Sequence, residues 1–375
     1  MSTRIFLSPP WMGGGEQERV SEAFASNYVA PTGPMVDRFE ALFSERVGIP
    51  NVCALSSGTA GLDLLFRELG VGRGDTVICS DLTFVASIAP AVQAGAEPVF
   101  IDCEAATWTM DAQLLAEALE DATRTGRRPK AVVAVDLYGQ CCDYDTLEAL
   151  CARHEVPLII DAAEALGARY GDRSAGDAGW AAVYSFNGNK IITTSGGGMV
   201  ASRQADVIAR ARKRSQQSRE AMPWYEHIEL GYNYRLSNIC AAIGVGQLAH
   251  LDTILARKRR IAAFYQERLQ ELTAITWMPQ APYGEGNHWL SILQLDPRQT
   301  GVTPEQLRLA LEAENIESRP VWKPMHMQPV FAGAKCYGGG VSERLFRQGL
   351  CLPSGAGLTG NDLERIAAVI QAQLG

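Results

Sequence analysis

The feature that most constrains the fold of this chain is the alternation of short apolar runs with amphipathic stretches between residues 50 and 200. The apolar runs have the length of buried strands and cover residues 52–55, 76–79, 99–102, 131–135 and 158–160. The stretches between them have helical spacing and cover residues 60–69, 86–94, 111–120 and 144–153. This alternation predicts an α/β unit in which helices cover a mainly parallel sheet. Ligands of such sheets bind beyond the carboxyl ends of the strands, where we look for functional residues.

The remainder of the chain has a different pattern. From residue 236 to about 272 the helical spacing continues with few breakers, which predicts one long helix between two units. Farther on we expect a strand at 289–295 and helices at 304–314 and 362–373. We therefore expect residues 1–250 to form an N-terminal segment and a large domain, and residues 251–375 to form a smaller C-terminal α/β domain.

The composition argues against several classes of function. The net charge is −8, and the basic triplet at 258–260 lies in a helical pattern typical of a solvated face, so we expect no nucleic-acid partner. Nine cysteines without a C-x-x-C pair, and five histidines without ligand spacing, indicate reduced thiols and no structural metal. The N-terminus lacks a signal-peptide pattern, and no apolar run reaches the ~20 residues of a membrane helix. We expect a cytoplasmic protein without membrane contact.

Two candidate binding features follow predicted strands. Residues 56–60 form a small-residue turn before a helix, whose N–H groups and dipole favour an anion. Gly58 allows close approach and Thr59 can donate a hydrogen bond, although an ordinary helix cap explains this segment equally well. Asp161 directly follows a buried strand and needs a partner, because an unpaired buried carboxylate is costly. One candidate partner is the backbone of residues 162–163, which Asp161 would cap. The other is a cation, such as the protonated ring nitrogen of pyridoxal 5′-phosphate (PLP).

The third feature is the segment 184–190, Tyr-Ser-Phe-Asn-Gly-Asn-Lys, which a glycine run follows at 196–198. Lys190 lies among small polar and apolar residues, and partial burial favours the neutral amine that can attack an aldehyde. Ser185 is placed to bind a phosphate, and the glycines permit a tight turn. A single lysine is ordinarily a solvated surface residue. The three features together predict that Lys190 carries PLP as a Schiff base.

The chain resembles the DegT/DnrJ/EryC1/StrS family of PLP-dependent sugar aminotransferases over essentially its full length. The matching segments lie at residues 6–10, 30–34, 57–60, 81–86, 161–164, 185–190 and 233–235. The resemblance implies a fold-type-I transferase, with a mainly parallel, mixed sheet of seven strands and a smaller C-terminal domain. It also implies a homodimer with shared active sites that takes L-glutamate and a nucleotide sugar as substrates.

The resemblance implies which residues bind the cofactor. Asp161 would pair with the ring nitrogen, Phe84 would stack on the ring, and Asn233 would reach the phosphate in the neighbouring subunit. Arg235 would reach that subunit's substrate. The full set that would contact PLP is Gly58, Thr59, Phe84, Asp161, Glu164, Ser185, Lys190 and Asn233.

Some positions depart from the family pattern. Glu164 stands where the family often has Gln or His near the phenolic oxygen of PLP. A carboxylate would repel that oxygen, so Glu164 is either protonated or points elsewhere. Residues 193–198 lack the glutamate that the family often has there, which changes a loop contact. Thr32 stands where similar enzymes often have Leu, which leaves the entrance of the sugar pocket undefined.

Residues 319–326 are dense in aromatic and cationic side chains. We expect Trp322 to pack on a sugar or base and Lys323 to meet the diphosphate, although a rigid domain edge explains the segment equally well. His326 is expected to be a hydrogen-bonded structural residue, and Trp289 is a candidate for the nucleotide pocket.

The predicted reaction is transamination from L-glutamate to C4 of a nucleotide-linked 4-keto-6-deoxy sugar, with Lys190 as tether and proton shuttle. The form of residues 185–190 most resembles enzymes that aminate this carbon. The favoured acceptor is UDP-2-acetamido-2,6-dideoxy-4-keto-hexose, and the alternative is GDP-4-keto-6-deoxymannose, as in GDP-perosamine synthesis. A PLP-dependent sugar dehydratase and a regulatory relative without turnover are rival functions. Lys190 argues against the dehydratase, because that branch of the family replaces the lysine with histidine.

Overall fold

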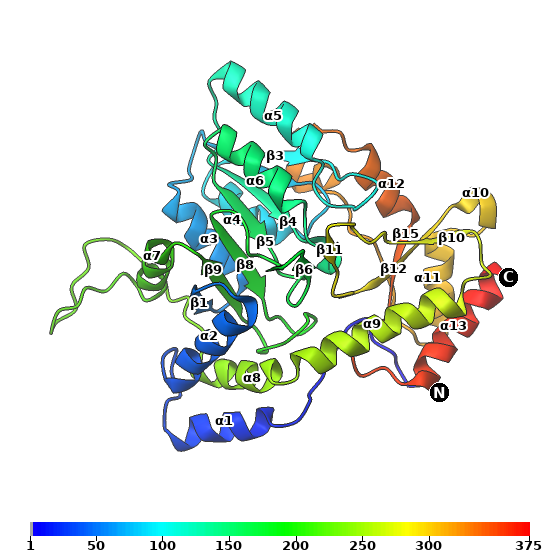
Figure 1. Ribbon diagram of the computed structural model, residues 1–375, viewed down its shortest axis with the longest axis horizontal. Helices are drawn as coiled ribbons and strands as arrows, with labels where there is room; N and C mark the ends of the chain where they lie inside the picture. Colours follow the sequence, from blue (N-terminus) through cyan, green and yellow to red (C-terminus); the bar gives the residue numbers. More distant parts are fainter. Residues whose placement is uncertain (1–2) are drawn as a thin grey trace.

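The computed structural model describes residues 3–375, and its centre is an eight-stranded sheet (Figure 1). The strand order is β1-β9-β8-β5-β4-β2-β3-β14. The bounds in that order are β1 (Asn51–Leu55), β9 (Gly198–Ser202), β8 (Ala181–Ser185), β5 (Leu158–Asp161), β4 (Ala131–Val135), β2 (Thr76–Ser80), β3 (Glu97–Ile101) and β14 (Lys335–Tyr337). Within these strands, β9 is antiparallel to both neighbours and the other pairs are parallel. The mainly parallel sheet is confirmed, and the predicted number of seven strands is wrong.

The eighth strand, β14, comes from the C-terminal part of the chain. It pairs in parallel with β3, from Lys335 opposite Val99 to Tyr337 opposite Ile101. Its three residues are too few and too polar to form an apolar run, so no strand pattern is visible there. The strand joins a segment that we assigned to the small domain to the edge of the large sheet.

Helices cover both faces of this sheet because successive residues of each strand point to opposite sides. In β2, Val77 and Cys79 belong to one core cluster, whereas Ile78 belongs to the other. The first cluster packs under α3 (Gly58–Glu68), α4 (Ala89–Gln93) and α7 (Ala205–Ser215). The second packs under α2 (Pro34–Val47), α5 (Ala112–Thr125), α6 (Tyr144–Arg153) and α8 (Asn238–Leu248), and α1 (Glu16–Ala25) lies beside α8.

The predicted helix at 86–94 is interrupted. A 3₁₀ turn covers Val85–Ser87, and the short helix α4 follows. Ile88 between them has φ −121° and ψ −23°, which is outside the helical region, and Pro90 lacks the N–H that an internal helix position would use. The interruption places Ser87 at the end of a loop that carries cavity residues.

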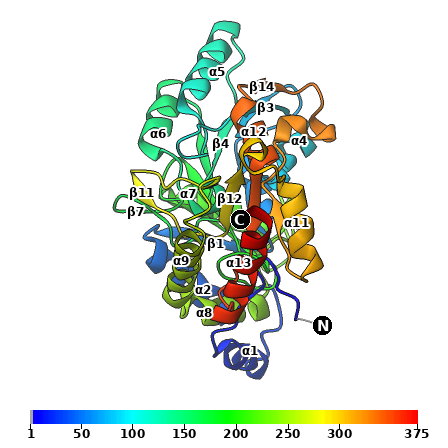
Figure 2. The same cartoon turned by 90° about the vertical axis from the view of Figure 1, so that its right-hand side faces the viewer.

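The C-terminal part, which faces the viewer in Figure 2, forms a second, antiparallel sheet in the order β10-β12-β15-β13. Its strands are β10 (Ile275–Trp277), β12 (Ser291–Leu295), β15 (Gly349–Leu352) and β13 (Arg319–Pro320). A third core cluster joins this sheet to α9 (Leu251–Arg268), α11 (Pro304–Ala313) and α13 (Gly360–Leu374). Ile5 belongs to the same cluster and bridges Ile316, so the beginning of the described chain packs with the C-terminal unit. The division at residue 250 stays a prediction.

The smaller elements complete the fold. They are α10 (Pro297–Thr300), α12 (Gly340–Gln348) and a three-stranded sheet of β11 (Gly284–Glu285), β6 (Arg169–Tyr170) and β7 (Arg173–Ser174).

The long helix predicted from residue 236 to 272 is two helices, α8 and α9, which meet at an angle of 62°. The break falls at Ala249 and His250, neither of which is a helix breaker, so the sequence pattern does not reveal it. His250 Nε2 lies 2.7 Å from the Gly14 carbonyl oxygen. No single helix among residues 3–375 is long and apolar enough to cross a membrane, and only this bent pair meets the length and composition criteria together.

Lys258 in α9 is buried and not on the solvated face that its sequence pattern indicates. Its side chain faces the C-terminal unit, and the residue is 3% exposed. Its Nζ atom donates to the carbonyl oxygens of Trp289 at 3.0 Å and Ser354 at 2.9 Å. Burial lowers the pKa of this lysine to about 7.

Candidate active site

A cavity of about 830 Å³ lies at the carboxyl ends of β4, β5 and β8. Its wall combines strand ends of the large sheet, the N-terminal segment 6–10 and side chains of the C-terminal part. The residues that line it and that the sequence singled out are Gly58, Thr59, Phe84, Asp161, Glu164, Ser185, Lys190, Trp289 and Trp322. The cavity therefore lies at the edge of the sheet where ligands of parallel sheets are expected to bind.

Lys190 lies on the turn that follows β8, and its side chain is 12% exposed. Its Nζ atom lies 3.4 Å from Glu164 Oε1 and 4.1 Å from the centre of the Trp289 ring. The Trp289 indole N–H donates to the Asn189 carbonyl at 2.7 Å, which fixes the ring beside the lysine. The amine is thus held between a carboxyl group and an aromatic face in a cavity wall.

Glu164 faces Lys190, and its side chain is 3% exposed. Its Oε2 atom accepts a hydrogen bond of 2.6 Å from the Tyr138 N–H. Burial raises the pKa of Glu164 to about 7, even though Lys190 and the Tyr138 N–H lower it. The carboxyl therefore points into the cavity, and it can hold a proton near neutral pH.

Asp161 ends β5 at the cavity wall. Its Oδ2 accepts from the Ser87 hydroxyl at 2.7 Å, and its Oδ1 accepts from the Ala163 N–H at 3.1 Å. Ser87 is itself 2.7 Å from the Thr83 hydroxyl. Burial raises the pKa of Asp161, while the Ser87 hydrogen bond and Lys190 lower it. Ser87 was not predicted as a site residue, because nothing in the pattern of residues 86–94 distinguishes it.

The N-terminus of α3 opens into the same cavity. Ser57 caps the helix by accepting from the Ala60 N–H at 3.0 Å, so the N–H groups of Gly58 and Thr59 remain at the cavity wall. A Cβ atom on Gly198 would lie 2.3 Å from the Gly58 nitrogen, so the strand can approach this turn closely only because it carries glycine there. With the Ser185 hydroxyl, these groups form a set of donors that suits an anion.

Aromatic rings line the opening of the cavity. Phe84 is 57% exposed, and its ring centre lies 5.6 Å from that of Trp322. Trp322 also contacts Tyr138, at 5.5 Å between ring centres, and Trp289, at 6.3 Å. The tyrosine is buried beneath the two tryptophans, and its hydroxyl accepts a hydrogen bond of 3.0 Å from the Trp322 N–H. The sequence pattern did not indicate that Tyr138 packs against these rings.

Three residues that were predicted to contact the cofactor or the substrate do not line the cavity. They are Arg235, Lys323 and Asn233. Arg235 was expected to bind substrate in the partner, and this expectation does not fit the structure. Its guanidinium is buried against Glu40 Oε1 at 2.8 Å and the Ala54 carbonyl at 2.8 Å, so it holds α2 to β1. The backbone of Lys323 accepts from Gln328. Asn233 is exposed and does not line the cavity of its own chain. Its expected contact with the phosphate in the neighbouring subunit stays a prediction.

The donor set of the cavity fits PLP. A buried carboxyl, Asp161, suits a protonated ring nitrogen, and the α3 N-terminus with Ser185 suits a phosphate. The amine of Lys190 suits an aldehyde, and the exposed ring of Phe84 suits a flat heterocycle. These groups lie around one cavity, although together they span the chain from Gly58 to Lys190.

Comparison with known proteins agrees with this chemistry. Residues 11–371 match the model of the DegT/DnrJ/EryC1/StrS aminotransferase family. The chain is 46% identical to EpsN of Bacillus subtilis (strain 168), which is named as a pyridoxal phosphate-dependent aminotransferase, over 99% of this chain and 96% of that protein. It is 36% identical to GDP-perosamine synthase of Caulobacter vibrioides, over 99% and 98% of the two chains. The crystal structure of the aminotransferase TlmJ from Streptoalloteichus hindustanus superposes with a TM-score of 0.91 at 29% identity, covering 99% and 98%. The chain belongs to the DegT/DnrJ/EryC1/StrS aminotransferase family and is a PLP-dependent sugar aminotransferase.

Proposed function

We propose that this enzyme transfers the amino group of L-glutamate to C4 of a nucleotide-linked 4-keto-6-deoxy sugar. The observation that carries the proposal is the position of Lys190, whose amine lies between Glu164 and Trp289 at the wall of the cavity. PLP, when bound, supplies an electron sink for the carbon from which a proton is removed. Lys190 Nζ would take this proton from the amino donor and deliver it to the cofactor in the first half of the reaction. In the second half it would move a proton in the opposite direction, from the cofactor to C4 of the sugar.

The other residues of the cavity divide into three tasks. Asp161 is proposed to keep the ring nitrogen protonated, with Ser87 holding its carboxyl in position. Gly58, Thr59 and Ser185 are proposed to bind the phosphate, and Phe84 to cover the ring.

Glu164 is proposed to face the phenolic oxygen as a protonated acid, because the raised pKa of the buried carboxyl favours the neutral form, which can donate a hydrogen bond. This assignment accommodates a glutamate at a position where the family often has a neutral or basic side chain.

For the acceptor, we propose UDP-2-acetamido-2,6-dideoxy-4-keto-hexose. The form of residues 185–190 supports a 4-keto-6-deoxy sugar, and Trp322 beside Phe84 offers an aromatic wall for a sugar or base. Similarity to GDP-perosamine synthases favours GDP-4-keto-6-deoxymannose as the second candidate. Lys323 stays a proposed diphosphate contact, although it does not line the cavity of the single chain. The cytoplasm is the proposed location, since nucleotide sugars are made there.

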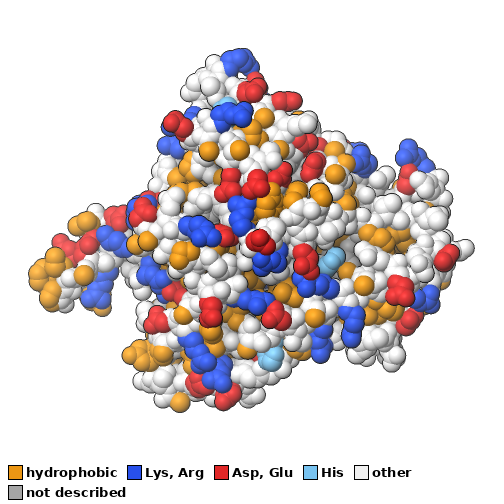
Figure 3. Space-filling view, viewed as in Figure 1, with side chains coloured by type: hydrophobic (Ala, Val, Ile, Leu, Met, Phe, Trp, Pro, Cys, Tyr) orange, Lys and Arg blue, Asp and Glu red, His pale blue; other side chains and the backbone are white. Residues whose placement is uncertain are grey.

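A second copy of the chain is the proposed partner. Residues 216–233 form an arm that extends from the large domain at the left of Figure 1, and Gln216 pairs with Asn233 at its base. Hydrophobic side chains gather at the tip of the arm in Figure 3, and large contiguous apolar patches are rare on monomeric proteins. Its exposed apolar side chains are Met222 (47%), Trp224 (58%), Tyr225 (79%), Ile228 (77%) and Leu230 (93%). We propose that the partner covers this surface and that the arm brings Asn233 to the partner's phosphate site.

Sedimentation tests the dimer. The double variant Tyr225→Ser/Leu230→Ser is expected to dissociate at protein concentrations at which the wild type sediments as a dimer, and to lose activity with dissociation. A variant that stays dimeric and fully active would contradict the proposed role of the arm.

The function is tested by supplying purified enzyme and PLP with L-glutamate and, in turn, UDP-, GDP- and dTDP-linked 4-keto-6-deoxy sugars. The expected result is an amino sugar identified by mass, formed with one 2-oxoglutarate per product, with the UDP-2-acetamido sugar giving the highest kcat/KM. Lys190→Ala is the control and should form neither product. A deoxy product without 2-oxoglutarate would replace transamination with dehydration, and a higher kcat/KM for the GDP sugar would establish the second acceptor.

A further inference from the structure

A strap of residues 321–327 leaves β13, carries Trp322 to the cavity opening and then crosses to the large sheet. At its end, a single 3₁₀ turn (Met325–Met327) contains His326, which does not line the cavity. Directly across from it lies Asp81, at the end of β2 and three residues before Phe84. The two aromatic rings that face each other at the opening, Trp322 and Phe84, therefore belong to two segments that meet at His326.

Three hydrogen bonds join these two segments, and α12 adds a fourth to Asp81 through Ser342. The Met325 N–H donates to the Asp81 carbonyl at 2.8 Å, and the His326 N–H donates to Asp81 Oδ1 at 2.9 Å. His326 Nδ1 lies 2.7 Å from Asp81 Oδ2, which also accepts from the Ser342 hydroxyl at 2.7 Å. Asp81 is fully buried, so its carboxylate depends on these protein donors and not on water.

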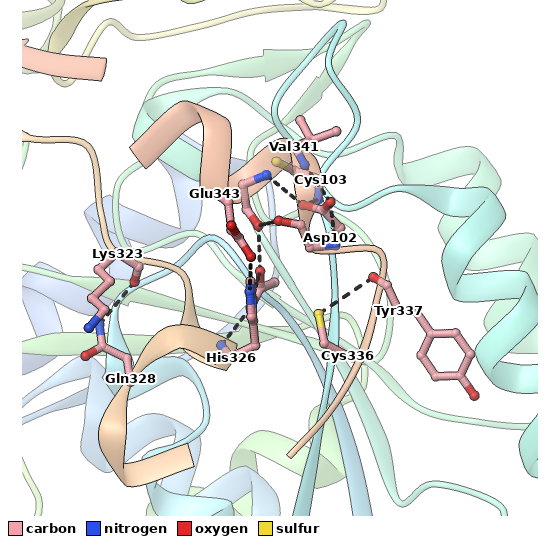
Figure 4. Close-up of polar contacts among 12 residues, drawn as sticks. Asp102, Cys103, Lys323, His326, Gln328, Cys336, Tyr337, Val341 and Glu343 are labelled. Atoms are coloured by element: carbon pink, nitrogen blue, oxygen red, sulfur yellow. Dashed lines mark hydrogen bonds and ion pairs between the residues drawn. The ribbon is translucent and has the colours of Figure 1, made fainter. Parts of the chain in front are cut away.

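The opposite edge of the His326 ring meets α12. His326 Nε2 lies 3.2 Å from Glu343 Oε1, and Figure 4 shows the two side chains facing each other. Asp102 holds the first turn of this helix by accepting from the N–H groups of Gly339, Val341 and Ser342. The histidine is thus clamped between carboxyl groups from two elements, each of which is fixed by its own hydrogen bonds.

We propose that His326, held between Asp81 and Glu343, is a positioning residue that sets the distance between Phe84 and Trp322 and so the affinity for the sugar acceptor. The proposal rests on the proposed function, because it assigns the two rings to the acceptor side of the cavity. His326 acts through its neighbours and not by touching substrate.

The geometry makes this clamp dependent on protonation. Both ring nitrogens face carboxylate oxygens, and only the imidazolium has an N–H to donate to each of them. Burial lowers the pKa of His326, but the contacts with Asp81 and Glu343 outweigh it and raise the pKa above its usual value of 6.5. The other polar groups around the ring are the Cys336 thiol, the Ser342 hydroxyl, and Arg347, which pairs with Glu343. As the pH rises through the pKa of His326, one of the two carboxylate contacts is lost.

A metal ion is an alternative occupant of this cluster, because donor atoms of Asp81, His326 and Cys336 lie within 4.8 Å of one another. Both oxygens of Asp81 already accept hydrogen bonds, however, and Asp81 Oδ2 accepts two. Burial and the nearby carboxylates strongly raise the pKa of the Cys336 thiol, which disfavours the thiolate that a metal requires. The hydrogen-bonded clamp is therefore the arrangement that these contacts support.

The test compares His326→Ala, His326→Asn and, as a matched control, His154→Ala, whose histidine ends α6 away from the cavity. His326→Ala removes both contacts and is expected to raise the KM for the keto-sugar about tenfold, with a smaller change in kcat. His326→Asn restores a donor toward Asp81 and should recover most of that loss. The wild-type KM for the sugar should rise with pH above the pKa of His326, and this rise should be absent in His326→Asn. The glutamate half of the reaction should be unchanged in every variant.

Hydrogen exchange does not require catalysis, so it tests the clamp independently of the proposed function. Hydrogen exchange measured by mass spectrometry should be faster in His326→Ala for the peptides that contain residues 81–84 and 321–327, and unchanged in His154→Ala. Unchanged exchange and unchanged KM in His326→Ala would overturn the clamp. One zinc ion bound per wild-type protomer, and lost in Cys336→Ser, would also overturn it. If the wild type aminates none of the sugars, the proposed function fails, and the exchange measurement still decides the clamp.

Discussion

Replacing Glu164 with glutamine removes one titrating group from the cavity wall and keeps its shape. Burial raises the pKa of this carboxyl from 4.5 to about 7, against the opposing effects of Lys190 and the Tyr138 N–H. A group whose folded pKa lies above its unfolded pKa stabilises the folded state fully below pH 4.5, and this contribution is lost as the pH rises through 7. Since each pH unit is worth about 1.4 kcal/mol, the whole loss is about 3 kcal/mol.

Glu164→Gln has no carboxyl group that can titrate at this position. We therefore expect the free energy of unfolding of Glu164→Gln, relative to the wild type, to shift by about 2.5 kcal/mol in favour of the variant between pH 5 and pH 8. The assay is urea unfolding of the cofactor-free proteins, followed by circular dichroism at one protomer concentration. Asp136, whose burial also raises its pKa to about 7, titrates in both proteins and cancels in the difference.

A constant offset between the two proteins does not bear on this prediction, because the glutamine also changes the contact with Lys190 at every pH. Parallel stability curves from pH 5 to pH 8 would refute the reasoning. They would show that Glu164 ionises as freely in the folded protein as in the unfolded chain, and it could not then serve as a protonated donor toward the cofactor.

Three further predictions concern other buried groups. Asp161→Asn should lower kcat/KM by about 100-fold or more, because the partner of the ring nitrogen loses its charge, and steady-state kinetics on PLP-saturated enzyme check this. Arg235→Met should lower the free energy of unfolding by about 1–3 kcal/mol, because Glu40 loses one buried partner and keeps Arg212. Its KM for the sugar, per folded protomer, should stay at the wild-type value, and a large rise would restore Arg235 as a substrate contact. As the pH rises from 7 to 9, the free energy of unfolding of Lys258→Met should fall relative to that of the wild type. The lowered pKa of the buried lysine makes the wild type gain stability as the pH rises, and a pH-independent difference in Tm would contradict this.

The sequence pattern was sufficient to predict candidate site residues that lie at the ends of strands. Apolar runs predicted β1 to β5, and the carboxyl-end rule predicted that Asp161 and Ser185 lie on one cavity, as they do in the structure. The turn at Gly58 was recognisable for the same reason, because a small-residue segment between a strand and a helix exposes N–H groups. These features are local, so a short window of sequence contains them.

Contacts between distant segments were not predictable. Ser87 reaches Asp161 across 74 residues, and Trp289 lies against Lys190 from a different unit. The burial of Arg235 depends on Glu40, which is 195 residues away and has no signal in its own helix pattern. The three-residue strand β14 is defined only by its pairing with β3. Each of these depends on tertiary packing, which periodicity does not encode.

The central claim is that Lys190 holds the cofactor, and covalent labelling tests it most directly. The enzyme is incubated with PLP, reduced with borohydride, digested and analysed by mass spectrometry, with the buried Lys258 serving as an internal control. The account predicts phosphopyridoxyl on Lys190 and none on Lys258, a visible absorption band that L-glutamate bleaches before reduction, and loss of the label and the band in Lys190→Ala. A label on another lysine, or a wild type that takes up no label and stays colourless, would contradict it.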